Sequence, residues 1–320
     1  MHDILISENI RGAAVDALSA RLDVVYEPDL WKDAAALLVR IHEFRGLIVR
    51  NQTMVNAALL DAGRNLVVVG RAGVGLDNVD VDHATQRGIL ITSTPDQNAI
   101  SVAELAIGLM ISLARMLPEA NRDTRDGNWN RHKFNGAELY GSTLGIVGAG
   151  KIGYLTARRA QAFGMRIVAH DPFISRDNVL LSELNAELLG LDELLAQADF
   201  VSCHLPSNKQ TAGIFDLDRF HKMKPTAFLI NTSRGEVIRE PDLVEALKTG
   251  VIAGAALDVR ASEPPTAGEL ETLSNLILTP HVAALTRQAQ ARVTSAICED
   301  VARVLDGKAA QNAVNKVPQR

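Results

Sequence analysis

Short apolar runs of strand length alternate with helical patterns along almost the whole of this chain. Runs rich in Val, Ile and Leu are followed by segments whose apolar residues recur at helical spacing. This alternation predicts βαβ units, and therefore parallel sheets that are covered by helices on both faces. The expected strands are Ile4–Ile6, Val24–Val25, Leu47–Val49, Leu66–Val69, Ile89–Ile91, Leu144–Val147, Ile167–Ala169, Phe200–Cys203, Phe228–Ile230, Ala253–Leu257 and Leu276–Leu278.

These strands fall into two groups, which are separated at about residues 92–142. So many strands exceed one compact doubly wound sheet, and 320 residues suffice for two cores, so we expect two α/β domains. A very apolar helix over Ala99–Leu117, stopped by Pro118, should be covered by the other domain or by a second subunit. A last helix over Thr286–Leu305 is expected to cross back to the first domain.

Charge and cysteine content argue against several classes of protein. With 33 Lys and Arg against 38 Asp and Glu, the formal net charge is −5, and we expect no nucleic-acid binding. Cys203 and Cys298 lie far apart without metal-ligand spacing, so we expect neither a disulfide framework nor a zinc ribbon. No signal-peptide pattern opens the chain, and no apolar stretch reaches the roughly 20 residues of a membrane span. We expect a cytoplasmic enzyme without a membrane anchor.

A GxGxxG motif follows the strand Leu144–Val147. Gly148 suits the tight turn, Gly150 allows close approach of a pyrophosphate, and Gly153 lets the following helix pack on the strand. The N-terminus of that helix offers N–H groups to the diphosphate. Asp171 ends the next strand, where a carboxylate accepts the ribose hydroxyls and repels a 2′-phosphate. The motif therefore predicts NAD rather than NADP.

A second glycine-rich loop, Gly70–Asn78, also follows a strand. Its third motif position is Asn78 rather than glycine, and no acidic residue closes the next strand, so we expect no cofactor there. Its glycine N–H groups beside Arg71 suit an anion such as a substrate carboxylate. The alternative is a tight turn with a solvated arginine.

Three functional side chains follow consecutive strands of the second group: Arg234, Glu263 and His281. Ligands bind outside the carboxyl ends of parallel strands, so these groups should converge. A guanidinium holds a carboxylate and polarises a ketone, an imidazolium gives a proton to the developing alkoxide, and a carboxylate keeps that imidazole protonated. No metal is needed for this chemistry. Each residue taken singly also fits a surface or packing role.

In these residues the sequence resembles the D-isomer-specific 2-hydroxyacid dehydrogenase family, in its phosphoglycerate-dehydrogenase-like branch. The likeness covers essentially the whole chain and implies a flavodoxin-like substrate domain (residues 1–98 and 285–320) and an NAD-binding Rossmann domain (residues 99–284). It implies a homodimer or a dimer of dimers, with Arg234, Glu263 and His281 as the catalytic set. The motifs that carry it are Gly70–Asp80, the GxGxxG with Asp171, Asn231–Gly235, Asp258–Val259 with Glu263–Pro265, and Thr279–His281. The implied cofactor contacts are Gly148, Gly150, Lys151, Ile152, Gly153, Asp171, Leu205, Thr232, Ser233, Arg234, Asp258 and His281.

The resemblance also indicates where the substrate binds. The implied substrate-binding residues are Arg50, Arg71, Ala72, Gly73 and Arg131. Arg131 lies in the run Trp129–Phe134, which resembles a basic segment that a neighbouring subunit presents to the substrate. So much positive charge favours a 2-hydroxy acid with a second anionic group, such as a phosphate or a sulfonate. The alternative is that these arginines are solvated or pair with local acids, and Asn51–Thr53 departs from the serine-containing form common in phosphoglycerate dehydrogenases.

Other functions stay open at this point. One is a glyoxylate or hydroxypyruvate reductase, and another is an NAD-sensing corepressor that keeps the same scaffold. Formate dehydrogenases carry an amide in place of the glutamate partner, so Glu263 argues against them. A short polar tail follows Leu305, so we expect no regulatory domain and no feedback inhibition by serine.

Overall fold

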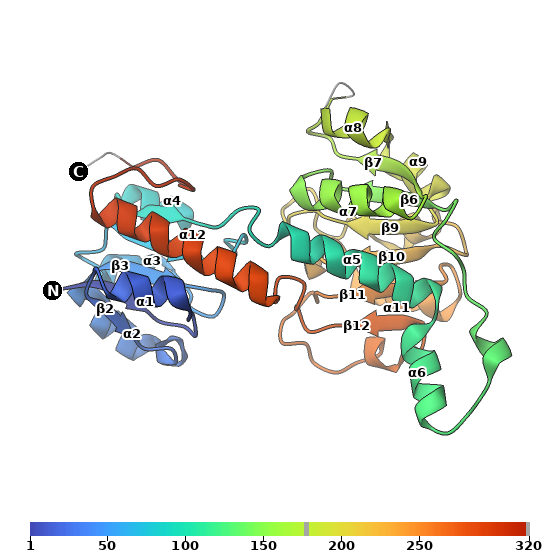
Figure 1. The fold of residues 1–320 in the computed structure, drawn as a ribbon, viewed down its shortest axis with the longest axis horizontal. Coiled ribbons are helices and arrows are strands. Elements are labelled where there is room, and N and C mark those ends of the chain that lie inside the picture. Colours follow the sequence, from blue (N-terminus) through green and yellow to red (C-terminus); the bar gives the residue numbers. More distant parts are fainter. Residues whose placement is uncertain (176–178, 318–320) are drawn as a thin grey trace. The chain divides into compact units, whose positions relative to one another are not determined.

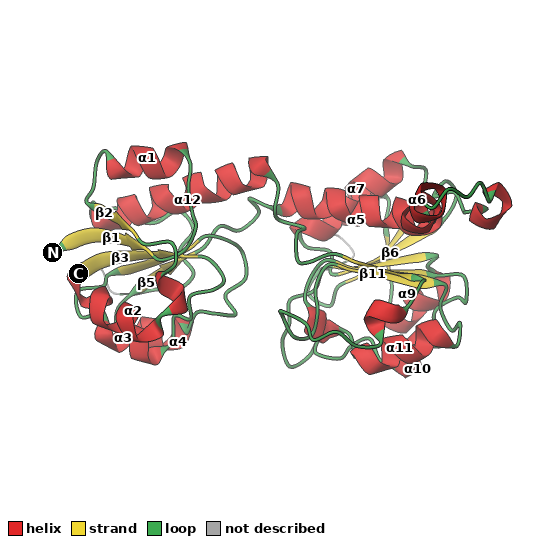
Figure 2. Cartoon of the chain, turned by 90° about the horizontal axis from the view of Figure 1, so that it is seen from below, coloured by secondary structure: helices red, strands yellow, loops and turns green. Residues whose placement is uncertain are grey.

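The structure is a computed structural model, and it describes residues 1–175 and 179–317. The chain divides into two compact units, one formed by residues 1–98 together with the segment from 285 onward, the other by residues 99–284 (Figure 1). Each unit is a parallel sheet between two layers of helices (Figure 2). In the described part of the chain, no single helix has the length and apolar character needed to cross a membrane.

The first unit has a five-stranded sheet in the order β2-β1-β3-β4-β5 among its described residues. This is the flavodoxin-like order, in which the chain starts inside the sheet and winds outward in both directions. The strands are β1 (His2–Ile6), β2 (Val24–Tyr26), β3 (Phe44–Val49), β4 (Val68–Arg71) and β5 (Leu90–Thr92). The helices are α1 (Ala13–Ser19), α2 (Ala34–Arg40), α3 (Ala57–Ala62), α4 (Val81–Gln86) and α12 (Arg287–Leu305), with 3-10 turns at Leu30–Lys32 and Ile41–Glu43.

Helix α12 returns to this unit and packs with α1 on one face of the sheet, opposite α2, α3 and α4 (Figure 2). Thr286 caps it, because its side chain accepts a hydrogen bond from the N–H of Ala289 at 3.1 Å. A Cβ at Gly70 would lie 2.6 Å from Cγ2 of Val301 and 2.9 Å from Cγ1 of Ile297. The first glycine of the Gly70–Asn78 loop is therefore required where α12 crosses β4.

The second unit has a seven-stranded parallel sheet in the order β12-β11-β10-β9-β6-β7-β8 within the described residues. Counted from its own first strand, this is the Rossmann order 3-2-1-4-5-6 with one more strand at the end. The strands are β6 (Thr143–Val147), β7 (Arg166–His170), β8 (Glu187–Leu188), β9 (Phe200–Cys203), β10 (Phe228–Asn231), β11 (Gly254–Leu257) and β12 (Leu276–Leu278). The helices are α5 (Ala99–Ala114), α6 (Leu117–Arg125), α7 (Lys151–Ala162), α8 (Val179–Leu184), α9 (Leu191–Gln197), α10 (Leu217–Phe220) and α11 (Glu240–Lys248), with 3-10 turns η3 (Arg131–Phe134), η4 (Gly235–Val237) and η5 (Leu270–Thr272).

The prediction of one helix over Ala99–Leu117 is wrong at its end. Helix α5 stops at Ala114, Met116 takes a left-handed conformation (φ 49°), and Pro118 lies in the first turn of α6. Proline is well tolerated there, because the first N–H groups of a helix have no partner within the helix. Helix α5 packs on α7, β10 and β11, so its own unit covers most of its apolar circumference.

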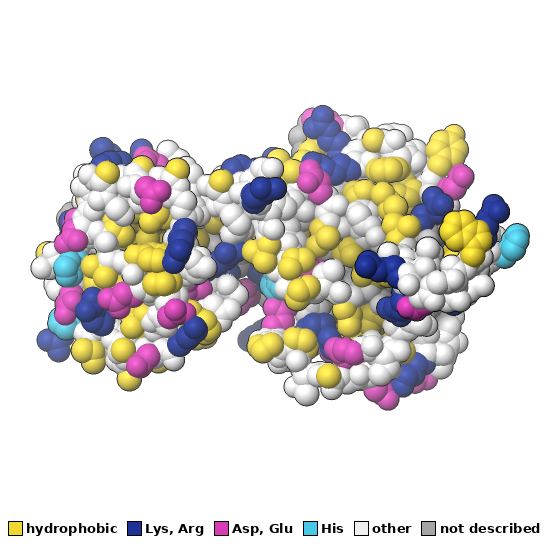
Figure 3. Space-filling view, turned by 60° about the horizontal axis from the view of Figure 1, so that its bottom comes forward, with side chains coloured by type: hydrophobic (Ala, Val, Ile, Leu, Met, Phe, Trp, Pro, Cys, Tyr) yellow, Lys and Arg dark blue, Asp and Glu magenta, His cyan; other side chains and the backbone are white. Residues whose placement is uncertain are grey.

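Charged groups of both signs alternate over the face drawn in Figure 3, where lysines and arginines lie among aspartates and glutamates. Both cysteines are buried, and burial raises the pKa of the Cys203 thiol and raises that of Cys298 to about 11. Both thiols therefore stay protonated at neutral pH.

Candidate active site

The glycine loop after β6 has the shape that a diphosphate needs. Gly148 has φ 96°, and a Cβ there would lie 2.6 Å from the carbonyl oxygen of His204. A Cβ at Gly153 would lie 2.2 Å from the carbonyl oxygen of Gly148, so α7 packs directly on the turn. Gly150 is the N-cap of α7, and nothing lies within 4 Å of a Cβ built there. The loop is tightly packed beneath and open above the helix N-terminus, and this arrangement fits a bound pyrophosphate.

Asp171 follows β7 and is tied to the glycine loop. Its Oδ2 accepts a hydrogen bond from the N–H of Ala149 at 3.0 Å, and its Oδ1 accepts one from the N–H of Phe173 at 2.9 Å. A carboxylate has about four acceptor sites, so capacity remains for ribose hydroxyls. The carboxylate is thus fixed beside the loop where the cofactor's adenosine half is expected.

The other implied cofactor contacts also lie at the carboxyl edge of this sheet. Lys151 and Ile152 open α7, Leu205 follows β9, and Thr232 and Ser233 follow β10. Ser233 donates hydrogen bonds from its N–H (3.0 Å) and its hydroxyl (2.7 Å) to Oδ1 of Asn231, which shapes the turn.

Sequence reasoning missed His204, the residue that follows β9. Its Nε2 lies 3.0 Å from the hydroxyl oxygen of Ser202, and burial lowers its pKa to about 3. Its backbone carbonyl lies against Gly148, so the residue after β9 packs directly on the glycine loop. The only signal in the sequence was the apolar run before His204, which predicts a buried strand and does not mark the histidine itself.

The three candidate catalytic residues follow three adjacent strands. Arg234 comes after β10, Glu263 after β11 and His281 after β12. Nδ1 of His281 lies 2.6 Å from Oε2 of Glu263, and both side chains are partly exposed. Arg234 is half-buried and donates from Nη1 to the carbonyl of Ser233 at 2.8 Å. The structure therefore brings the imidazole and the carboxylate into hydrogen-bond contact, with the guanidinium in the loop after β10.

Asp258 and Asn231 tie these loops together. Asp258 is 1% exposed, and its carboxylate accepts hydrogen bonds from the Thr279 hydroxyl (2.5 Å) and from the N–H groups of Val282 (2.9 Å) and Ala283 (2.8 Å). Its N–H donates to the carbonyl of Asn231 at 2.9 Å, and Asn231 donates from Nδ2 to the carbonyl of Arg234 at 2.8 Å.

This network fixes the backbone on both sides of His281, which has φ 53°, and its N–H donates to the Asp258 carbonyl at 2.8 Å. A left-handed histidine is uncommon outside strained or functional positions. The buried carboxylate of Asp258 therefore holds the imidazole's loop in an unusual conformation.

In the first unit, Arg50 follows β3 and Arg71 ends the neighbouring β4. Glu8 is 3% exposed and accepts hydrogen bonds from the N–H groups of Arg50 (2.8 Å), Gln52 (3.1 Å) and Thr53 (2.9 Å). Burial lowers the pKa of the Arg50 guanidinium, and the negative charge of Glu8 acts in the opposite direction. Glu8 is therefore a local acid for Arg50 as well as the anchor of its loop.

In the loop after β4, the guanidinium of Arg71 lies against Gly73. Gly73 has φ 154°, and a Cβ there would lie 1.7 Å from Nη1 of Arg71, so the arginine occupies the space that only glycine leaves. Ala72 is buried and its N–H donates to the carbonyl of Val49 at 2.8 Å, while the N–H of Thr94 donates to the carbonyl of Gly73 at 3.1 Å. The loop is packed rather than extended, with Arg71 folded over it.

The model of the NAD-binding domain of D-isomer-specific 2-hydroxyacid dehydrogenases matches residues 107–283. D-3-phosphoglycerate dehydrogenase of Archaeoglobus fulgidus is 40% identical over 314 residues, which are 98% of this chain and 59% of that protein. The protein of the same name from Rattus norvegicus is 39% identical over 316 residues, which are 98% of this chain and 58% of that protein.

This chain belongs to the D-isomer-specific 2-hydroxyacid dehydrogenase family. The resemblance read from its motifs is confirmed, and so is NAD as the cofactor of its second unit. The chain spans less than two thirds of the length of these two relatives.

Solved structures confirm the fold class of the chain. A protein from Thermus thermophilus has a TM-score of 0.91 at 36% identity, covering 98% of this chain and 100% of that one. The holo form of D-mandelate dehydrogenase from Rhodotorula graminis has a TM-score of 0.91 at 26% identity, covering 99% of each chain.

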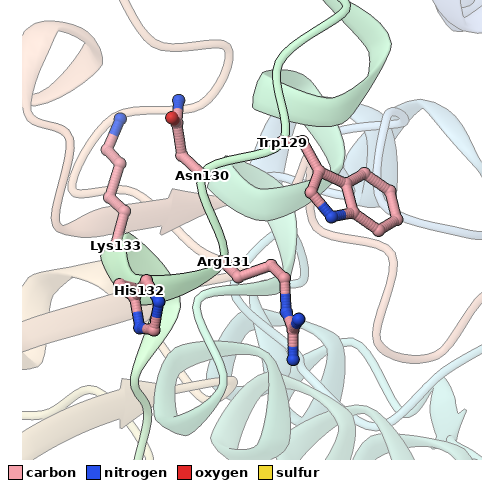
Figure 4. Close-up of a pocket in the computed structure, with 5 residues that line it drawn as sticks. All are labelled: Trp129, Asn130, Arg131, His132 and Lys133. Carbon is pink, nitrogen blue, oxygen red and sulfur yellow. The ribbon is translucent and has the colours of Figure 1, made fainter.

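The chain also has a basic turn, which follows α6. Arg131 lies in η3 and is exposed, next to Trp129, which is 79% exposed. Asp123 of α6 holds this turn through the Nδ2 of Asn130 (3.1 Å) and, at 3.9 Å, the Nζ of Lys133. Residues Trp129 to Lys133 line a shallow pocket of their own (Figure 4). The turn that carries Arg131 is therefore anchored on α6.

Proposed function

We propose that this chain is an NAD-dependent dehydrogenase that interconverts a 2-hydroxy acid and its 2-keto acid. The observation that carries the proposal is the 2.6 Å contact between Nδ1 of His281 and Oε2 of Glu263, at the carboxyl edge of an NAD-binding sheet. An imidazole paired in this way suits proton transfer to a substrate oxygen.

Each of the three residues has a separate task in this proposal. Bound NAD supplies or accepts the hydride. His281 holds the proton for the substrate oxygen on Nε2, because Nδ1 is engaged by Glu263. The Glu263 carboxylate orients the imidazole through Nδ1, and Arg234 binds the substrate carboxylate and polarises the keto group.

We propose that Asp171 binds the hydroxyls of the adenosine ribose. Its replacement by asparagine keeps an acceptor for the Ala149 N–H and loses the charge. We expect the KM for NADH to rise about 10- to 100-fold, because hydrogen bonds to a charged group contribute about 1.5–3 kcal/mol. We expect a smaller change of the KM for NADPH, since a 2′-phosphate is no longer repelled. Steady-state kinetics with both cofactors test this, and an unchanged ratio of the two KM values contradicts it.

For the substrate, we propose a 2-hydroxy acid with a second anionic group, like 3-phosphoglycerate or sulfolactate. Arg50 and Arg71 lie at the ends of adjacent strands of the first unit, and Arg131 offers a further cation from the same or a neighbouring subunit. The names of the Archaeoglobus fulgidus and Rattus norvegicus relatives support the phosphate form. The alternative is a glyoxylate or hydroxypyruvate reductase. The contact of Glu8 with the Arg50 loop favours this alternative, because Glu8 is a local acid that already offsets the charge of Arg50. We also propose a homodimer or a dimer of dimers, which light scattering tests.

A substrate panel decides between the two. We expect kcat/KM with NADH to be at least about 10-fold higher for phosphohydroxypyruvate or sulfopyruvate than for hydroxypyruvate, glyoxylate or pyruvate. Arg50→Gln should lower kcat/KM for the two dianionic acids more than for glyoxylate. Arg45→Gln is the matched control, because Arg45 lies at the opposite end of β3, where it pairs with Asp3 at 3.3 Å. A clear preference for the singly charged acids rules out the dianion proposal and leaves the dehydrogenase proposal intact.

A further inference from the structure

The loop that carries Glu263 is exposed over nine consecutive residues, 261–269. Glu263 nevertheless has both oxygens engaged: Oε2 contacts Nδ1 of His281 at 2.6 Å, and Oε1 accepts from the N–H of Arg260 at 3.0 Å. Exposed loops are mobile unless their bases are held, and a site on a loop is only as well placed as its support. Arg260, which immediately precedes the exposed run, has a side chain that is only 11% exposed.

The Arg260 guanidinium lies between two carboxylates from two other elements. Its Nε and Nη2 contact the two oxygens of Glu240, the first residue of α11, at 3.0 and 3.3 Å. Its Nη1 contacts Oε1 of Glu271 in η5 at 2.5 Å. Glu271 follows the exposed run, so Arg260 joins the start of the loop to its end and to α11. A two-pronged arginine–carboxylate pair fixes direction as well as distance.

The same two carboxylates bind the loop's backbone. Glu240 accepts a hydrogen bond from the N–H of Ala261 at 2.8 Å, and Glu271 accepts one from the N–H of Gly268 at 2.7 Å. On its other side the backbone of Arg260 lies against Gly235, where a Cβ would be 1.9 Å from the Arg260 carbonyl carbon. The hydrogen bonds from Arg260 and Gly268 lower the pKa of Glu271 to about 2, so the carboxylate is charged at neutral pH.

We propose that Arg260 is a positioning residue that sets the contact between Glu263 and His281 by clamping the base of loop 261–269 to Glu240 and Glu271. The inference rests on the proposed function, in which Glu263 and His281 carry out proton transfer. It adds a residue that touches neither the substrate nor the reacting atoms and acts through the loop.

The test compares Arg260→Met with Lys224→Met. The first change removes both ion pairs at the loop base. The second removes the pair between Lys224 and Asp199 (2.7 Å), which lies at the amino edge of the same sheet. For both variants we measure kcat and KM for phosphohydroxypyruvate with NADH, thermal unfolding, and the tautomer of His281 by ¹⁵N NMR, with His281→Gln assigning the signal.

We expect Arg260→Met to lower kcat about 10-fold or more with little change in the KM for NADH, because small misplacements of catalytic groups are costly. The Nδ1–H tautomer of the neutral His281 should give way to a mixture, since Glu263 no longer fixes it. Arg260→Lys should restore part of both values, and Lys224→Met should leave both at the wild-type level. Arg260→Gln is measured in the same way, so that a folding failure of the Met variant still leaves a test.

Wild-type kcat and tautomer in Arg260→Met and Arg260→Gln overturn the inference. If the wild type turns over a 2-keto acid and His281→Gln does not, that result leaves the proposed function standing. If the wild type turns over none of the acids, the proposed function fails, and the tautomer of His281 still reports whether Arg260 positions Glu263.

Discussion

Replacing His281 with alanine is expected to lower kcat for 2-keto acid reduction about 100- to 10,000-fold, the range that general acid catalysis supplies. The imidazole is the group that gives the proton to the developing alkoxide, and its removal leaves Glu263 without its 2.6 Å partner. NADH binding should persist, because the glycine loop and Asp171 lie after β6 and β7 rather than after β12. Single-turnover stopped-flow measurement and titration of NADH fluorescence separate the two effects.

The matched control is His221→Ala. It removes an exposed histidine that directly follows α10 and contacts the carbonyl of Leu217. It should leave kcat and the Kd for NADH within about twofold of the wild type, as surface substitutions usually do. Glu263→Gln should fall between the two, because an amide still accepts from Nδ1–H but forms a weaker hydrogen bond than a charged carboxylate does. Unchanged single-turnover rates in His281→Ala would remove the histidine from the mechanism.

The fold was largely predictable, because both sheets are parallel and buried on both faces, so their strands read as continuous apolar runs. The exception among the strands is β8, which has two residues at the edge of its sheet, Glu187 and Leu188. A strand of two residues is too short to give an apolar run, so the sequence does not mark it. The end of α5 was placed three residues too late, because the apolar residues Met116 and Leu117 follow it and only the left-handed backbone at Met116 marks the break.

The candidate catalytic residues could be predicted from the sequence, and the residues that hold the loops of the two units could not. Arg234, Glu263 and His281 follow strands, and the rule that ligands bind beyond the carboxyl ends of parallel strands places them on one edge. By contrast, Glu8 binds the loop at Arg50, more than 40 residues away, and nothing local in the sequence marks that contact. Gly70 illustrates the same limit, because its missing side chain is explained only by α12, which arrives from the end of the chain.

Asp258→Ala is expected to cause the largest loss of stability at the site. The buried carboxylate accepts three hydrogen bonds from the loop around His281. Two of the donors are the backbone N–H groups of Val282 and Ala283, which remain in the variant and lose their acceptor. Leaving buried donors unsatisfied costs about 1–3 kcal/mol each, so the free energy of unfolding should fall by about 3–5 kcal/mol. At roughly 2–4 °C per kcal/mol, the melting temperature should fall by about 10 °C, which calorimetry measures.

Thr279→Val separates the network from a single bond, because it removes only the 2.5 Å contact of the Thr279 hydroxyl with Asp258 and keeps the shape of the side chain. It should cost about 1–2 kcal/mol, well below the loss in Asp258→Ala. Activity should follow the same order at temperatures where both variants are folded. The reason is that His281 has a φ of 53° that the loop must maintain, and Asp258 holds the loop immediately after it. Equal losses in the two variants would mean that the hydroxyl contact, and not the two backbone contacts, holds the imidazole's loop in place.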